Sequence, residues 1–139
     1  MGTVIRAELS KKNKYWIERH RYYELKHFCM QYPIWKKVYS AIEGARGIAP
    51  ERILSVVRNM PSDPTAKAAI AKLYYSDKID LVERVAKEAD PELSSYILKG
   101  VTEGVSYEYL KTRLEIPCCK DTYYDRYRRF FWLLSKERQ

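Results

Sequence analysis

Apolar side chains recur every three or four residues through most of this chain, and no stretch alternates apolar with polar residues over the length of a strand. Such spacing places the apolar side chains along one side of a helix. The sequence therefore predicts an all-α protein, a helical bundle in which proline and glycine mark where helices begin and end.

In the N-terminal half, we expect a first helix over 15–31 that Pro33 ends or kinks, followed by a second helix over 34–43. Glycines and prolines then predict a loop with one short, uncertain element around 52–58. Because this stretch is the clearest hinge in the chain, we predict a helical region over 1–60 and another over 61–139. One compact domain overall remains an alternative.

Three further helix starts are signalled in the C-terminal half. Asp63 followed by Pro64 fits a cap and first position for a segment reaching residue 89, as one helix or two in tandem. Asp90-Pro91 repeats this signal for a helix that Gly104 ends. Ser106 is then expected to cap a short helix over 107–114, and a last helix runs from about residue 120 to 137.

The short helix and the final helix together predict a helix-turn-helix within about 90–139. At 100° per residue, the final helix has an inward face that we expect to pack against Leu110 and Leu114. The inward residues are Tyr123, Tyr127, Phe130, Phe131 and Leu134. The outward residues are Asp121, Asp125, Arg128, Arg129, Trp132 and Lys136, flanked by Thr122, Tyr124 and Arg126.

Charge is unevenly distributed in this chain of 139 residues with net charge +8. Residues 1–50 hold ten basic and four acidic side chains, and residues 111–139 hold eight and four, whereas the middle is slightly acidic. Positive ends favour contact with a polyanion such as nucleic acid. The alternative is that lysine and arginine only solvate the polar faces of helices.

The segments SYEYL at 106–110 and CKDTYYDRYRRFF at 119–131 resemble the C-terminal helix-turn-helix of RinA and ArpU type phage transcriptional activators, which is similar to region 4 of sigma factors. HRYYELKHFCMQYPIWKK at 20–37 and SDPTAK at 62–67 also resemble small phage proteins that carry this module. The resemblance implies a phage or prophage regulator of late-gene transcription that binds promoter DNA. By analogy, the recognition-helix residues are Lys120, Thr122, Tyr124, Asp125, Arg128 and Arg129.

Further surface contacts follow from position along the predicted helices. Tyr107, Lys111 and Arg113 lie on the scaffold helix, where side chains usually hold phosphates. Trp132 faces outward, so either a partner or the N-terminal helices of the same chain must cover it. A second surface with aromatic stacking could arise where Lys11, Lys12, Lys14, Arg19 and Arg21 interleave with Tyr15, Trp16, Tyr22 and Tyr23, although an aromatic core with a basic rim is the alternative.

No feature of the sequence favours an enzyme, a cofactor or a metal site. There is no glycine-rich phosphate loop, nucleophile elbow or zinc-ligand spacing. The sequence lacks a long apolar run and an N-terminal signal segment, and Cys29, Cys118 and Cys119 are expected to be free thiols, so we expect a cytoplasmic protein.

The leading functional hypothesis is therefore a sequence-specific regulator that binds double-stranded DNA. The alternative is an interaction factor that binds host RNA polymerase or another host machine without reading DNA. RNA binding ranks third. Contact with polymerase in addition to DNA, the direction of regulation and the formation of a homodimer remain open.

Overall fold

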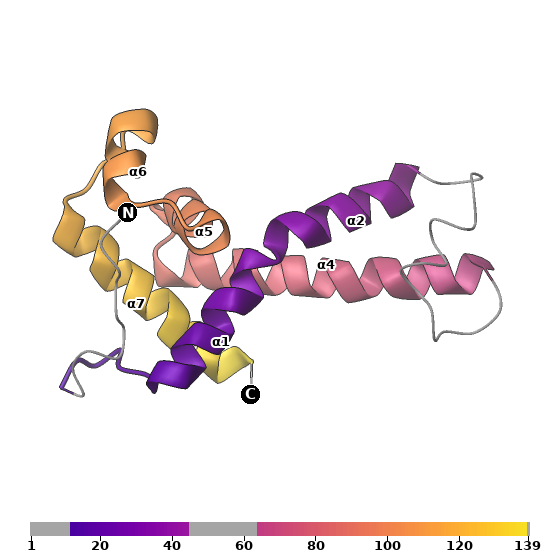
Figure 1. The fold of residues 1–139 in the computed structure, drawn as a ribbon, viewed down its shortest axis with the longest axis horizontal. Helices are drawn as coiled ribbons and strands as arrows, with labels where there is room; N and C mark the ends of the chain where they lie inside the picture. The colour runs from indigo at the N-terminus through magenta and orange to yellow at the C-terminus, as the bar shows by residue number, and fades with distance from the viewer. Residues whose placement is uncertain (1–11, 45–63, 139) are drawn as a thin grey trace. The chain divides into compact units, whose positions relative to one another are not determined.

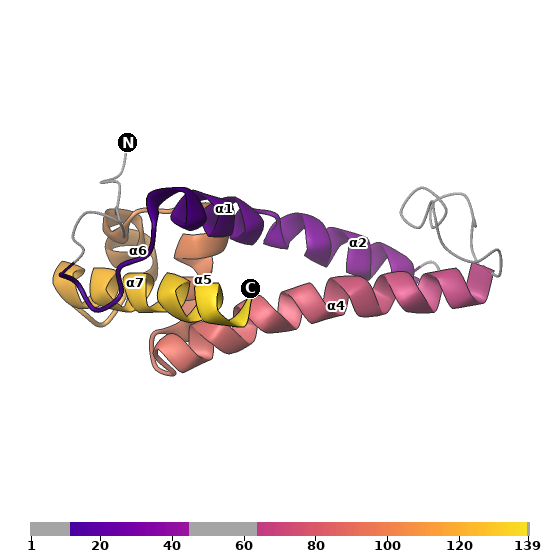
Figure 2. The ribbon, with the colours of Figure 1, turned by 90° about the horizontal axis from the view of Figure 1, so that it is seen from below.

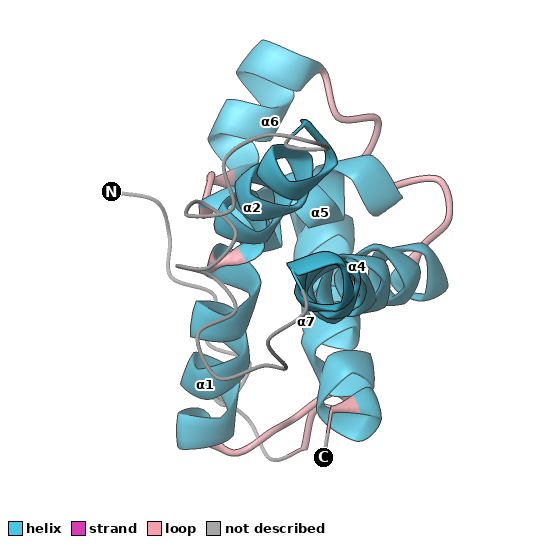
Figure 3. Cartoon of the chain, turned by 90° about the vertical axis from the view of Figure 1, so that its right-hand side faces the viewer, coloured by secondary structure: helices cyan, strands magenta, loops and turns pink. Residues whose placement is uncertain are grey.

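The computed structural model describes residues 12–44 and 64–138 of the chain. Within these ranges every regular element is an α-helix, as the colouring of Figure 3 shows, so the all-α prediction is confirmed. The predicted element around 52–58 and the Asp63 cap lie outside the described residues. In chain order the helices are α1 (Arg19–Met30), α2 (Tyr32–Gly44), α4 (Pro64–Ala89), α5 (Ser94–Glu103), α6 (Tyr107–Leu114) and α7 (Lys120–Glu137) (Figure 1).

Three helix starts differ from the prediction, for local reasons. α5 begins at Ser94 rather than at Asp90-Pro91, because the Asp90 carboxylate accepts from the N–H groups of Glu92 and Leu93 and forms a turn before the helix. α1 begins at Arg19 because the Glu18 carboxylate accepts hydrogen bonds from the backbone N–H groups of His20 and Arg21, at 2.8 and 3.1 Å. Pro33 lies in the first turn of α2, where its missing N–H removes no helical hydrogen bond. α4 is one continuous helix rather than two in tandem.

The helices group into two compact units. One unit contains α1, α5, α6, α7 and the end of α4 from Val82, and the other contains α2 and α4 up to Leu81. This grouping differs from the division predicted at about residue 60, because α1 packs against α5 and α7 (Figures 1 and 2). The first helix therefore belongs with the C-terminal module.

An aromatic core fills the first unit. Its rings are those of Tyr22, Tyr107, Tyr123, Tyr124, Tyr127, Phe130 and Phe131, all of them buried. The hydroxyls of Tyr22 on α1 and Tyr127 on α7 share a hydrogen bond of 3.0 Å, which satisfies both of them inside the core. Phe131 meets the Tyr22 ring edge-on at 5.1 Å between centroids. These contacts hold α1 against α7, although the two helices lie near opposite ends of the sequence.

The second unit has a smaller core between α2 and α4. Ile42 and Ala71 are buried in it, with Val38, Ala68 and Tyr75 packed around them. Lys72 and Glu43 form an ion pair at its edge. No residue that we predicted to bind DNA lies in this unit.

Gly100 on α5 allows α7 to approach closely. A Cβ atom at this position would overlap the hydroxyl oxygen of Tyr123. That hydroxyl is buried and has no hydrogen-bond partner among the described residues. Burial therefore raises the pKa of Tyr123 above its ordinary range.

Gly100→Ala is expected to lower the free energy of unfolding by about 1–3 kcal/mol, because the added methyl group overpacks the interface between α5 and α7. Adding Tyr123→Phe should restore part of the loss by removing the overlapping oxygen. Urea denaturation followed by circular dichroism measures both effects. Gly44→Ala is the matched control, since no atom lies within 4 Å of the added methyl group there. Equal stability of the two alanine variants would contradict the predicted overlap.

Candidate nucleic-acid interface

The connections from α5 to α7 are set by capping interactions. Gly104 ends α5 in the left-handed conformation, with φ of 71°, as the sequence predicts. Ser106 caps α6, because its hydroxyl accepts a hydrogen bond of 3.2 Å from the Tyr109 N–H. Glu115 then ends α6 with φ of 53°, and the N–H of Ile116 donates to the carbonyl of Leu110 at 3.2 Å. Both predicted caps are confirmed.

The predicted inward face of α7 is also confirmed, since all five of its residues are buried. Leu110 of α6 is fully buried as expected, but Leu114 is 38% exposed, so its predicted place in the core is wrong. The reversal at Glu115 carries Ile116 into the core, where it is 6% exposed.

Two predicted DNA contacts are wrong because their side chains are buried. Tyr124 is 7% exposed, and its hydroxyl accepts a hydrogen bond of 3.4 Å from the Tyr107 N–H. Tyr107 is also 7% exposed, and its hydroxyl donates to the Cys118 carbonyl at 2.5 Å. These two tyrosines join the start of α6 to the connection before α7. They shape the candidate interface from within and do not reach its surface.

Three predicted recognition residues on α7 remain at the surface. Lys120 is exposed and forms an ion pair of 3.4 Å with Glu108 on α6. Thr122 is half-buried, with its hydroxyl 3.2 Å from the Cys119 sulfur. Arg128, two turns further on, is half-buried and has no ion-pair partner among the described residues.

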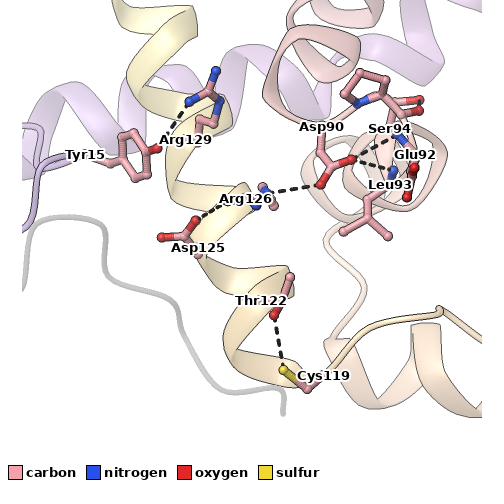
Figure 4. Close-up of polar contacts among 11 residues, drawn as sticks. Tyr15, Asp90, Glu92, Leu93, Ser94, Cys119, Thr122, Asp125, Arg126 and Arg129 are labelled. Carbon is pink, nitrogen blue, oxygen red and sulfur yellow. Dashed lines mark hydrogen bonds and ion pairs between the residues drawn. The ribbon is translucent and has the colours of Figure 1, made fainter.

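Asp125, an acidic residue on the predicted outward face of α7, forms an ion pair with the neighbouring Arg126. Its carboxylate binds Arg126 Nη1 at 2.6 Å, while Arg126 Nε binds Asp90 at 3.1 Å (Figure 4). The other oxygen of Asp90 accepts from the N–H groups of Glu92 and Leu93, at 2.9 and 3.2 Å. Asp90 thus orders the turn before α5 and holds Arg126 in place. The pKa of Arg126 is raised, chiefly by its hydrogen bond to Asp90.

Lys111 and Arg113 are both exposed in the last turn of α6. Positively charged side chains stabilise a helix at this position, because the carboxyl end of a helix carries a partial negative charge. Lys111 and Glu108 are three residues apart and so share a face of α6. Lys120 of α7 pairs with that same Glu108, so the start of α7 lies beside α6.

Residues 12–17, which we call the strap, contact the second half of the outward face of α7 through Tyr15. Tyr15, 5% exposed, packs on Trp132 with 5.5 Å between ring centroids. The Tyr15 hydroxyl accepts a hydrogen bond of 3.2 Å from Arg129 Nη1 (Figure 4). That bond, followed by the nearby Lys14, lowers the pKa of Tyr15. The same chain therefore covers part of Trp132, as one of the two sequence alternatives proposed.

Two of the four aromatic residues of the predicted stacking surface near the N-terminus are buried, as the alternative of an aromatic core with a basic rim expects. Tyr15 and Tyr22 are buried in the first unit and cannot stack on bases. Arg21 is bonded to Glu24 and to Ser135 on α7, at 2.5 and 3.2 Å. Lys12, Lys14 and Arg19 are exposed, and Lys11 lies outside the described residues.

The three cysteines are free thiols. Burial raises the pKa of Cys29. A hydrogen bond with Thr122 lowers the pKa of the exposed Cys119, which precedes α7. In the described parts of the chain, no group of three acidic, histidine or cysteine side chains is arranged to hold a metal ion. Among the described helices, none combines the length and apolarity needed to cross a membrane.

Comparison of the chain with protein-family models, curated protein sequences and solved structures gives no match. The resemblance to RinA and ArpU type activators therefore rests on the sequence segments quoted above.

Proposed function

We propose that this protein binds double-stranded DNA through a surface formed by α6 and the first half of α7. The surface comprises Lys111, Arg113, Lys120, Thr122 and Arg128, and we call it the α6–α7 surface. One observation carries the proposal: α7 has an aromatic face buried in the core, while Lys120 at its start and Arg128 two turns later remain at the surface. This division is what a helix lying in the major groove requires.

The two helices would have different roles in the complex. An α-helix fits the major groove, so Lys120 and Thr122 at the start of α7 would approach the base edges. Lys111 and Arg113 on α6 would bind backbone phosphates and fix the orientation of the protein. Since Lys120 already pairs with Glu108, duplex binding exchanges one exposed ion pair for a contact with the duplex, at small cost.

Regulation of transcription is the biological role that we propose for this binding. Support comes from the resemblance of residues 106–131 to phage activators of late genes, and the cytoplasm is the compartment in which such a protein would act. The alternative of a protein-interaction factor has less support, because Tyr15 and Lys136 already contact the Trp132 ring, which is half-buried and not the exposed contact patch that the sequence suggested.

Selection of bound sequences from random duplex DNA tests the proposal. We expect a short enriched motif, and we expect Arg128→Ala to weaken binding to it by about 1–3 kcal/mol, because a lost arginine contact to guanine has that magnitude. Lys87→Ala, an exposed lysine on α4, is the control and should leave the motif and affinity unchanged. Absence of any enriched motif would contradict sequence-specific reading by α7.

A further inference from the structure

Basic side chains of the strap and of the second half of α7 surround one pair of aromatic rings. The Lys14 ammonium lies 5.0 Å from the centre of the Tyr15 ring, and the Lys136 ammonium lies 3.5 Å from the centre of the Trp132 ring. Arg129 bonds to the Tyr15 hydroxyl at 3.2 Å. Because the two rings are themselves in contact, the three cations lie around one ring pair, and we call them the cluster.

This cluster lacks the carboxylates that neutralise other cations of the unit. Among the described residues, Lys14, Arg129 and Lys136 form no ion pair, and the Nε atom of Arg129 has no hydrogen-bond partner. The nearest acids in sequence are engaged elsewhere. Asp125 binds Arg126, Glu137 binds Arg84, and the Glu18 carboxylate caps α1.

Three like charges held together without counter-charges repel one another, and a bound anion relieves that repulsion. Cation–π contacts hold two of the ammonium groups in place while leaving their N–H donors able to bind oxygen. Because Tyr15 packs against one part of the Trp132 ring and Lys136 lies over its face, that ring is poorly placed to stack on a base. The chemistry therefore favours phosphate over nucleobase.

We propose that Lys14, Arg129 and Lys136 form a second phosphate-binding site, the strap site, which holds the DNA backbone beside the groove that α7 enters. This inference rests on the proposed function and adds a contact that the helix-turn-helix alone does not supply. At a rise of about 1.5 Å per residue, Arg129 lies roughly 14 Å along the helix from Lys120. A straight helix therefore reaches from base edges to a bordering backbone, since the major groove is about 12 Å wide.

The test compares the salt dependence of duplex binding between two double variants of the full chain. Lys14→Ala/Lys136→Ala should weaken binding about 10-fold or more and make the slope of log K against log salt shallower by about two. The control is Lys26→Ala/Lys87→Ala, which removes the same charge and also one cation–π contact, between Lys26 and Tyr23. Lys14→Arg/Lys136→Arg should retain the wild-type slope, since the charge is kept.

The outcomes separate this site from the α6–α7 surface. Equal slopes for the strap variant and its control would overturn the strap site and leave the proposed function standing. Loss of binding in the strap variant, with Lys120→Ala/Arg128→Ala unaffected, would support the strap site and overturn the α6–α7 surface. An equal effect on single-stranded DNA would overturn the assignment to a duplex backbone, and no DNA binding by the wild-type chain would overturn both proposals.

Discussion

Phe131→Ala is expected to lower the free energy of unfolding by about 3–5 kcal/mol, a large share of what holds a domain of this size together. Phe131 is fully buried, and its ring contacts those of Tyr22, Tyr127 and Phe130 at 5.0 to 5.1 Å between centroids. Truncation removes edge-to-face contacts with both α1 and α7 and leaves a cavity that rigid neighbouring rings fill poorly.

Chemical denaturation of the full chain measures this loss, and Tyr109→Ala provides the control. Tyr109 is an aromatic residue on α6 of the same unit but is 41% exposed, so its truncation should cost no more than about 0.5 kcal/mol. If the two variants were equally stable, the aromatic core would not be the main source of stability in this unit.

The second large effect concerns the affinity for duplex DNA. It should fall about 100-fold between roughly 50 mM and roughly 200 mM salt if about four phosphates are neutralised, because each contact releases counterions from the duplex. Lys111, Arg113, Lys120 and Arg128 are the four positive charges that the α6–α7 surface brings to the duplex, on phosphates or in the groove between them. The strap site would steepen the dependence further.

Local signals in the sequence predict much of the fold. The caps at Gly104 and Ser106 and the five inward residues of α7 follow from chemistry within a few neighbouring positions. The helical wheel placed Tyr124 at the border of the outward face. It is buried because Tyr107 packs beside it, and a wheel drawn for one helix contains no information about a neighbour.

Long-range contacts are what the sequence could not predict. Tyr15 and Arg129 are 114 residues apart, and nothing near either residue indicates that they meet. The same holds for Tyr22 and Tyr127, which place α1 in the C-terminal unit. Of the predicted recognition residues, Lys120, Thr122 and Arg128 stay at the surface, whereas Arg129 and Asp125 are held by Tyr15 and Arg126.

A salt titration of binding to duplex DNA by the wild-type chain tests the central claim most directly. The expected result is a straight line of log K against log salt with a slope of about −3 to −4, steeper if the strap site also binds phosphate. Arg113→Ala should reduce that slope by about one, and Lys87→Ala should not change it. A slope near zero, or an Arg113→Ala slope equal to that of Lys87→Ala, would contradict DNA binding through α6 and α7.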